Sequence, residues 1–247
     1  MAKKTTHLAV DLGAGSGRVM AGHFDGRRMD IEEINRFAND GLRVPSGWHW
    51  NLPGLFADIK TGLTAAHKLH GRSLVSLAVD TWGVDYGLFD VHGRLLGLPW
   101  MYRDSRTDGM MELAARRVPR EEIYRRTGIQ FMFFNTLFQL LAEAERSPEA
   151  VAAADRLLFM PDLLTYWLSG EQVVERTIAS TSQLLKAGSA EWDLGLADAL
   201  GIPSRLLHPV IEPASTVGTL LPEILTETGC GALRVVACGG HDTASAV

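Results

Sequence analysis

Residues 11–18, Asp-Leu-Gly-Ala-Gly-Ser-Gly-Arg, are the first segment of the sequence that could carry chemistry. Alternate glycines leave backbone N–H groups bare, and together with the hydroxyl of Ser16 these groups can cradle phosphate oxygens. Arg18 would add positive charge, and Asp11 could hold a hydrated Mg²⁺ ion. A dinucleotide fingerprint and a Walker loop are both excluded, because the third fingerprint glycine and the Gly-Lys-Ser/Thr run are missing. The alternative is an ordinary glycine-rich hairpin.

Residues 80–85, Asp-Thr-Trp-Gly-Val-Asp, form a second polar cluster at the end of an apolar run. Gly83 allows close approach to the backbone. The indole of Trp82 suits the C–H faces of a sugar, and the hydroxyl of Thr81 can bind sugar oxygens. These residue types predict one wall of a ligand cleft. The alternative is a turn between two strands.

The third cluster is Gly-Gly-His-Asp-Thr at residues 239–243. Its two glycines free the backbone, and three hydrogen-bonding side chains follow at the predicted start of a helix. Asp242 could act as a general base that takes a proton from a substrate hydroxyl, with His241 and Thr243 positioning a sugar. The alternative is a helix cap beside a surface histidine.

Together, the three clusters predict phosphoryl transfer to a polyol. Other residues that could do chemistry have simpler interpretations. His67 and His70 lie on the apolar side of a predicted helix, and we interpret them as packed residues rather than metal ligands. Gln139, Glu143 and Arg146 share the polar face of another predicted helix, which we expect to face solvent.

Composition excludes several classes of protein. The 247 residues are 46% hydrophobic and 21% charged, with 24 Lys and Arg against 29 Asp and Glu, so the chain is globular and mildly acidic. It has no basic footprint for nucleic acid or an anionic membrane, and no apolar run approaches the ~18 residues of a membrane span. Two cysteines are too few for a disulfide framework, and the first twelve residues do not resemble a signal peptide. We therefore expect a cytoplasmic protein without nucleic-acid or membrane partners.

The clusters need a sheet to position them, and the first hundred residues predict one. Strands at 7–12, 18–24 and 29–34, joined by glycine turns, predict an antiparallel meander. A helix is expected from Pro53 to Gly71, then a strand at 74–79 and a hairpin with arms 86–90 and 94–100.

The remainder is predicted to be mainly helical, and together the two parts give a single α/β unit. The expected features are a capping box at 105–108 before a helix at 110–118, helices at 119–128, 136–146 and 161–170, and a last strand at 233–238.

The sequence closely resembles the FGGY carbohydrate kinases. The resemblance runs the length of the chain, in family order, on residues 10–20, 80–85, 102–107, 128–130, 135–137, 160–162 and 241–247. It implies an actin-like ATPase (ribonuclease H-like) fold, with a mixed sheet that starts as a β-meander and is flanked by helices. The blocks at 80–85 and 241–246 look specific to members that use ATP and Mg²⁺ to phosphorylate the 1-hydroxyl of the ketose L-rhamnulose.

The resemblance also assigns site residues by position. Ala14, Gly15, Ser16, Gly17 and Arg18 match the family's ATP phosphate hairpin, although Gly15 stands where relatives often have Ser or Thr. Gly83, His241, Asp242 and Thr243 match the sugar contacts, with Asp242 as the proton acceptor. Thr81 and Trp82 are expected to contact the sugar, and Asp11 the metal, from the chemistry of their side chains. Tyr102, Asp104 and Arg106 resemble an element near the sugar cleft.

Such kinases have a second lobe that binds the nucleotide, and we expect residues 1–247 to be the first, sugar-binding lobe only. That lobe should be inactive alone, and its exposed lobe interface could drive a homo-oligomer. The alternatives are specificity for L-fuculose, xylulose or glycerol, a non-catalytic sugar-binding lobe, and an α/β domain without a site.

Overall fold

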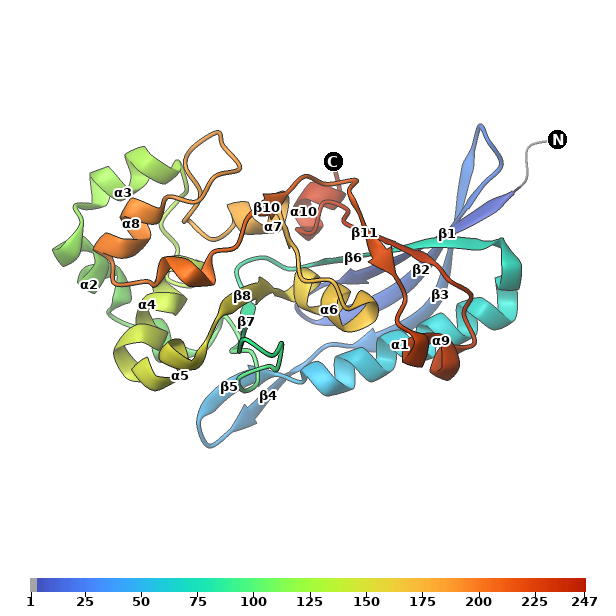
Figure 1. Ribbon diagram of the computed structural model, residues 1–247, viewed down its shortest axis with the longest axis horizontal. Helices are drawn as coiled ribbons and strands as arrows, with labels where there is room; N and C mark the ends of the chain where they lie inside the picture. The colour runs from blue at the N-terminus through green and yellow to red at the C-terminus, as the bar shows by residue number, and fades with distance from the viewer. Residues whose placement is uncertain (1–3) are drawn as a thin grey trace.

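A six-stranded mixed sheet organises the chain, and the structure, a computed structural model, describes residues 4–247 (Figure 1). Across the sheet the strands follow the order β11-β12-β6-β1-β2-β3. β1 is antiparallel to β2 and parallel to β6. The strands are β1 (Thr5–Leu12), β2 (Ser16–Phe24), β3 (Met29–Ala38), β6 (Leu74–Thr81), β11 (Thr216–Thr219) and β12 (Arg234–Val236). The predicted meander and the predicted α/β class are confirmed.

The two faces of the sheet have different surroundings, because side chains alternate along each strand. Leu8, Val10 and Leu12 of β1 are buried in the core. The residues that alternate with them, Ala9 and Asp11, line an open groove. The sheet therefore has one face packed in the core and one face that presents polar side chains.

α1 (Leu52–His70) packs on the core face. A Cβ added to Gly62 would come within 2.9 Å of the Cβ of Val19 on β2, so the helix and the sheet are in direct contact. The helix begins after Asn51, whose side chain accepts a hydrogen bond from Gly54 N, and ends at Gly71, where φ is 48°. This helix and its final glycine were predicted correctly.

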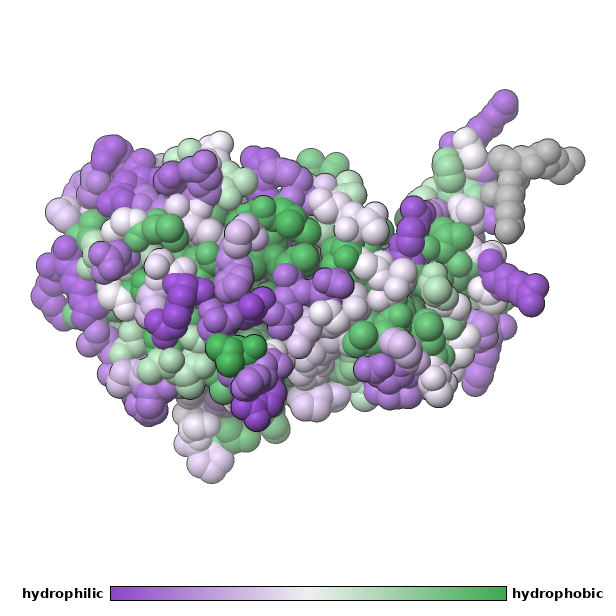
Figure 2. All heavy atoms as spheres, viewed as in Figure 1, coloured by the Kyte–Doolittle hydropathy of each residue, from purple (hydrophilic) through white to green (hydrophobic). Residues whose placement is uncertain are grey.

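The regular structure of the remaining chain is mainly helical, as predicted. In Figure 1, α2, α3, α4, α5 and α8 form the end of the molecule opposite the β1–β3 meander, and α6 lies between that end and the sheet. The helices are α2 (Met110–Arg117), α3 (Arg120–Thr127), α4 (Thr136–Arg146), α5 (Pro148–Ala153), α6 (Met160–Ser169), α7 (Arg176–Ser180), α8 (Leu194–Ala199), α9 (Pro222–Thr228) and α10 (Asp242–Ser245). On the face shown in Figure 2, hydrophilic residues gather over the α2–α3 end.

One local prediction was correct only in part, and another was wrong. Residues 94–96 turn back on β7 (Tyr86–Phe89) as predicted, with Leu96 N donating to Leu88 O at 2.8 Å and a bridge between Phe89 and Leu95, but the arm does not continue along β7 to residue 100. The strand partner of β7 is β8 (Arg156–Phe159). The predicted capping box is absent, because Asp104 caps a short 3₁₀ helix, Ser105–Thr107, and α2 begins after Gly109.

Three smaller strand pairs complete the fold. β4 (Gly41–Val44) and β5 (Gly47–Trp50) make a hairpin that the sequence analysis did not predict. β9 (Val174–Glu175) pairs with β10 (Val210–Ile211) beside α7, and the third pair is β7 with β8. Among residues 4–247, no helix combines the length and apolar character that crossing a bilayer requires.

Candidate active site

Asp242 lies where two hollows of the molecule meet. The first, which we call the aromatic cavity, has a volume of about 490 Å³ and is lined by residues of five regions, namely 82–84, Tyr102, 129–135, 180–181 and 241–242. The second, which we call the carboxylate groove, has a volume of about 840 Å³ and lies on the open face of the sheet, where it is lined by Asp11, Arg18, Asp80, Asp242 and Thr243 among others. Asp242 lines both hollows, and its side chain is 38% exposed. A group bound in one hollow can therefore meet a group bound in the other at this carboxylate.

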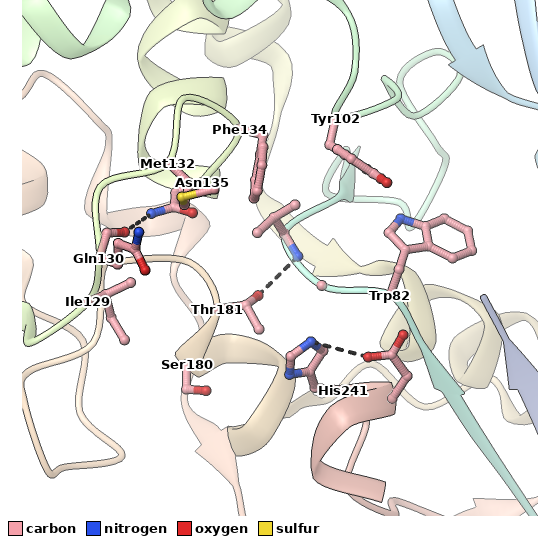
Figure 3. Close-up of a pocket in the computed structure, with 13 residues that line it drawn as sticks. Trp82, Tyr102, Ile129, Gln130, Met132, Phe134, Asn135, Ser180, Thr181 and His241 are labelled. Carbon is pink, nitrogen blue, oxygen red and sulfur yellow. Dashed lines mark hydrogen bonds and ion pairs between the residues drawn. The ribbon is translucent and has the colours of Figure 1, made fainter. Parts of the chain in front are cut away.

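The aromatic cavity combines flat apolar walls with a few polar groups, as sites for small ligands do. Figure 3 shows Trp82 and Tyr102 on one side, Ile129 and Gln130 on the opposite side, and His241 at the base. The indole of Trp82 packs on that of Trp50, with ring centroids 4.0 Å apart. This arrangement suits a ligand that presents C–H faces as well as hydroxyl groups.

Asp85 holds the aromatic wall from behind. It is fully buried, and its Oδ2 accepts hydrogen bonds from the indoles of Trp50 (2.7 Å) and Trp82 (3.0 Å) and from Tyr102 N (3.1 Å). Its Oδ1 accepts one from Gln139 Nε2 (2.8 Å). Burial raises the pKa of Asp85 to about 6, and these four hydrogen bonds favour the charged form in opposition.

The polar face of α4 is exposed at Arg146, as predicted, but it is covered at Gln139 and Glu143, contrary to the prediction. Gln139 is 1% exposed and bridges Asp85 to Arg106, whose Nη2 donates to its Oε1 at 2.8 Å. Glu143 pairs with the buried guanidinium of Arg106 at 2.6 Å. Helical periodicity identified the polar face correctly, but a second polar layer covers part of that face. Asp104 accepts hydrogen bonds from Trp48 N and Arg106 N, so it belongs to the same network of polar groups around Arg106.

The Gly83–Val84 turn is held in a backbone conformation that is rare for a β-branched residue. Val84 has a φ of 71°, and its N–H and C=O are fixed by Thr181 Oγ1 (3.0 Å) and Thr136 Oγ1 (2.7 Å). A Cβ on Gly83 would lie 3.1 Å from Thr181 and 3.3 Å from His241 Nε2. Position 83 therefore favours glycine because neighbouring protein atoms leave little room for a side chain. Strained turns of this kind cluster at functional sites.

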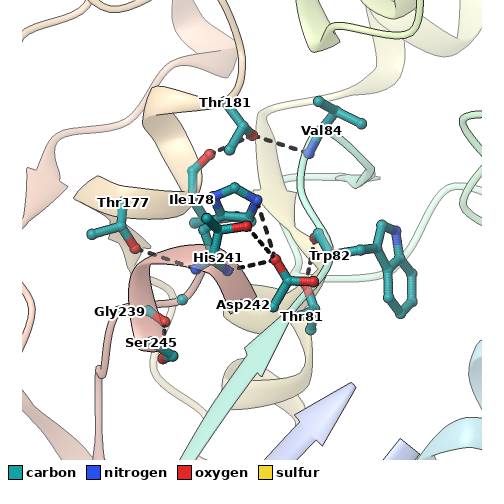
Figure 4. A network of polar contacts seen from close by, with 12 residues as sticks. Thr81, Trp82, Val84, Thr177, Ile178, Thr181, Gly239, His241, Asp242 and Ser245 are labelled. Atoms are coloured by element: carbon teal, nitrogen blue, oxygen red, sulfur yellow. Dashed lines mark hydrogen bonds and ion pairs between the residues drawn. The ribbon is translucent and has the colours of Figure 1, made fainter. Parts of the chain in front are cut away.

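Glu175 fixes the turn that carries His241 and Asp242. It is 2% exposed, and its Oε2 accepts from Gly240 N at 2.9 Å and Ile178 N at 3.1 Å. Its other oxygen accepts from Thr177 N, and Thr177 Oγ1 accepts from His241 N at 3.2 Å. Figure 4 follows this network from Thr177 to His241, whose Nε2 lies 3.3 Å from Asp242 Oδ1.

Two further carboxylates face Asp242 across the carboxylate groove. Asp11 and Asp80 are register partners on β1 and β6, and Asp11 also pairs with Arg18 at 2.7 Å. Burial and the negative charges of Asp11 and Asp242 together raise the pKa of Asp80 to about 7. Carboxylates that converge in this way offer the oxygen ligands that Mg²⁺ prefers.

The glycine turn opens beside this groove. Gly13 lines the groove, and its N–H donates to Ser16 O at 2.9 Å, which closes the turn. Gly15 and Ser16 are exposed, Ala14 is partly exposed, and Asn39 Nδ2 donates to Gly13 O at 2.8 Å. Backbone groups are therefore accessible at the tip of the turn.

Two of the expected contact residues are buried instead. Gly17 pairs with both neighbouring strands, and a Cβ there would collide with the ring of Phe37, so its glycine is explained by packing. Thr81 is fully buried, and its hydroxyl donates to Trp82 O at 2.8 Å. Thr81 N also donates to Gly240 O at 2.9 Å, which joins two of the predicted clusters. The structure gives Thr81 a supporting position and does not place it in the lining of either hollow.

The sequence analysis did not select Asp80, Glu175 or Thr181 as site residues. For Asp80 a signal was present, since two apolar strands each end in an aspartate. Glu175 and Thr181 gave no local signal, because they act on segments more than 60 residues away.

Comparison with known proteins identifies the chain's relatives. The model of the N-terminal domain of the FGGY family of carbohydrate kinases matches residues 6–247. The rhamnulokinase of Bacteroides thetaiotaomicron is 43% identical over 245 residues, which cover 99% of this chain and 50% of that protein. The rhamnulokinase of Pectobacterium atrosepticum is 43% identical over 242 residues, covering 97% of this chain and 48% of that protein. The chain spans about half the length of the curated relatives it matches.

Solved structures share the fold. The gluconate kinase of Lactobacillus acidophilus superposes with a TM-score of 0.84 at 15% identity, over 96% of this chain and 49% of that chain. The ligand-bound xylulose kinase of the same organism superposes with a TM-score of 0.83, also at 15% identity, over 96% and 48%. These likenesses confirm the fold class expected from the sequence.

Proposed function

The chain belongs to the FGGY family of carbohydrate kinases, and on that premise we propose that it binds the ketose L-rhamnulose and supplies the base for its phosphorylation by ATP. The position of Asp242 between the two hollows carries this proposal. The sugar occupies the aromatic cavity, and the phosphoryl group approaches from the carboxylate groove.

In the proposed reaction the 1-hydroxyl of the sugar gives its proton to Asp242 as its oxygen bonds to the γ-phosphorus of ATP. The bond between that phosphorus and the bridging oxygen of ADP breaks, and ADP leaves. His241 lies against Asp242, so it is placed to orient the carboxylate and a sugar hydroxyl. Positioning and charge stabilisation account for most of the catalysis of phosphoryl transfer.

The residues of the carboxylate groove fit a Mg²⁺ ion. Three carboxylates meet there and Arg18 offsets them in part, so a bound cation would relieve the repulsion that raises the pKa of Asp80. Asp80 and Asp11 would hold the ion, which would neutralise phosphate charge. Ala14, Gly15 and Ser16 would offer the phosphates backbone N–H groups and a hydroxyl, with Arg18 nearby.

Catalysis also needs, in this proposal, the part of the relatives' length that the chain does not span. The adenosine would bind there, and closure of the two parts would exclude water from the hollows. Residues 1–247 alone should therefore bind sugar and turn over poorly.

Calorimetry with residues 1–247 tests the sugar-binding half of the proposal. We expect L-rhamnulose to bind more tightly than L-fuculose, D-xylulose or glycerol. Preference for another of these sugars would leave the kinase class intact and reassign its substrate, whereas no binding of any sugar would refute the assignment of the aromatic cavity. A coupled ADP-release assay on a protein that includes the rest of the relatives' length tests the transfer step.

A further inference from the structure

Two histidines and a glutamate converge near the end of β2 that lies away from Arg18. His23 lies on β2, Glu32 on β3, and His70 is the last residue of α1. His23 is the register partner of Thr6 on β1, while Arg18 is the partner of Asp11, so about five residues of strand, roughly 17 Å, separate this cluster from the Asp11–Arg18 pair.

The three side chains aim their ligand atoms at one point. His23 Nε2 and His70 Nε2 each lie 3.0 Å from Glu32 Oε2, and the three atoms all lie within 4.8 Å of one another. In a tetrahedral zinc site, bonds of 2.0–2.2 Å place neighbouring ligand atoms about 3.4 Å apart. Each of the two distances from Glu32 to a histidine would need to lengthen by only about 0.4 Å to admit an ion.

A chain of hydrogen bonds fixes which nitrogen of His23 carries the proton. The carbonyl of His70 can only accept, so Ser73 Oγ donates to it at 2.9 Å. Ser73 Oγ must then accept from Thr6 Oγ1 (2.9 Å), and Thr6 Oγ1 must accept from His23 Nδ1 (3.1 Å). With Nδ1 as the donor to Thr6, Nε2 of His23 faces the carboxylate of Glu32 and is free either to carry a second proton or to bind a metal ion through its lone pair.

His70 gives an independent indication of the same two possibilities. Its Nε2 is buried and makes no hydrogen bond of good geometry, although it lies beside Glu32 Oε2. The side chains of His23 and His70 are 20% and 18% exposed, and that of Glu32 is 44% exposed, so an ion could enter from solvent. The interpretation of His70 as a packed helix residue is therefore incomplete, because its ring nitrogen faces a carboxylate and another imidazole.

We propose that His23, Glu32 and His70 form a binding site for a divalent transition metal, with Zn²⁺ as the best match. Two imidazoles and one carboxylate are ligands typical of zinc, whereas Mg²⁺ prefers oxygen ligands. Thr6 positions His23 for the ion, since a hydrogen bond to the other ring nitrogen orients a metal-bound histidine. The ion would tie the end of α1 to β2 and β3, and the fourth position would hold water.

Zinc titration of the 247-residue chain without an affinity tag, followed by calorimetry with excess Mg²⁺ present to fill carboxylate sites, tests the site. We expect one Zn²⁺ per chain, a rise in Tm on addition of Zn²⁺, and the visible absorption of tetrahedral cobalt when Co²⁺ replaces it. His23→Ala, His70→Ala and Glu32→Gln should each weaken binding at least about tenfold and abolish the rise in Tm. Thr6→Val, which keeps the shape of the side chain, should weaken binding about tenfold or more.

His92→Ala is the matched control, because it removes an exposed histidine far from the cluster in sequence. It should bind Zn²⁺ as the wild type does. The proposal would be overturned if the wild-type chain binds no Zn²⁺, or if the variants of His23, Glu32 and His70 bind it as tightly as the control does. A proton shared with Glu32 would then explain the close contacts of the two imidazoles. If an alanine variant does not fold, as judged by circular dichroism, Glu32→Gln decides the question. No readout involves sugar or ATP, so this test is independent of the proposed function.

Discussion

Asp11 and Asp80 are register partners on the parallel strands β1 and β6, so their carboxylates emerge side by side on the open face of the sheet. Arg18 pairs with Asp11 only, and Asp80 is 8% exposed. As a result, burial and two neighbouring negative charges raise the pKa of the Asp80 carboxyl group to about 7. Such an arrangement costs stability and is typical of functional sites.

The first prediction is that Asp80→Asn stabilises the chain at high pH. The pKa of Asp80 is raised from 3.8 in the unfolded chain to about 7, so the folded state holds a proton that the unfolded state releases. Its contribution to stability is fully present below pH 3.8 and is lost as the pH rises through about 7. At pH 8 the variant should be more stable by up to about 4 kcal/mol, and near pH 4 the difference should largely vanish.

Urea unfolding at pH 4 and pH 8 measures this difference. Asp198→Asn, which removes an exposed acid on α8, is the control and should show no such change with pH. An Asp80→Asn variant that is no more stable than the wild type at pH 8 would show that the carboxylate is not under repulsion.

The second prediction separates two glycines of the first turn. A Cβ at Gly17 would lie 2.7 Å from Leu12 and would collide with Phe37, so Gly17→Ala should destabilise the chain by about 1–3 kcal/mol. Gly15 is exposed and has no atom within 4 Å of an added Cβ, so Gly15→Ala should change stability by less than about 0.5 kcal/mol. Denaturant unfolding of the two variants provides the comparison.

Gly15 also tests the phosphate cradle. If the N–H of Gly15 binds a phosphate oxygen, Gly15→Pro, which removes that donor, should raise the KM for ATP several-fold in a protein with the rest of the relatives' length, whereas Gly15→Ala, which keeps it, should change the KM little. An unchanged KM in Gly15→Pro would move the phosphates away from this residue, whatever the stability result for Gly17.

The third prediction concerns the support of the aromatic wall. Asp85→Asn would turn an amide toward Gln139 Nε2, so two donors would face each other. Gln139 cannot simply flip, because its Oε1 accepts from Arg106. We expect a loss of about 1–3 kcal/mol in stability and several-fold weaker sugar binding, because Trp82 and Tyr102 lose their anchor.

Urea unfolding and sugar calorimetry measure these two effects. Asp108→Asn, at an exposed position, is the control and should change neither quantity. Weakened sugar binding with unchanged stability would mean that Asp85 contacts the ligand region directly rather than through its neighbours.

Local patterns predicted much of the fold, and long-range contacts explain where prediction failed. The meander followed from alternation and glycine turns, and α1 from periodicity and its final glycine. The pairing of β7 with β8 joins residues about 70 positions apart, which no local pattern reveals. For the same reason, the polar face of α4 was mistaken for a solvated surface at Gln139 and Glu143, since these side chains meet Arg106 rather than water.

In the candidate site, too, local patterns were predicted and long-range contacts were not. The three clusters were recognised from residue types, and the structure brings Asp242 to both hollows. The groups that hold those clusters in place, Asp85 and Glu175 above all, act through contacts with distant segments. Gly17 and Thr81 were overinterpreted, because membership of a motif does not distinguish a contact residue from a packed one.

The last prediction is that Asp242→Asn abolishes phosphoryl transfer while sugar binding persists. An amide cannot accept the hydroxyl proton at neutral pH, and loss of a general base lowers rates about 10²–10⁴-fold. The substitution keeps the size of the side chain, and an Asn oxygen can still accept from Thr243 N, so the turn should remain intact. A coupled assay measures kcat in a protein with the rest of the relatives' length, and calorimetry measures the sugar Kd, with Asp198→Asn as the matched control for both. A kcat close to that of the wild type would remove Asp242 as the base, and loss of sugar binding would make it a binding residue instead.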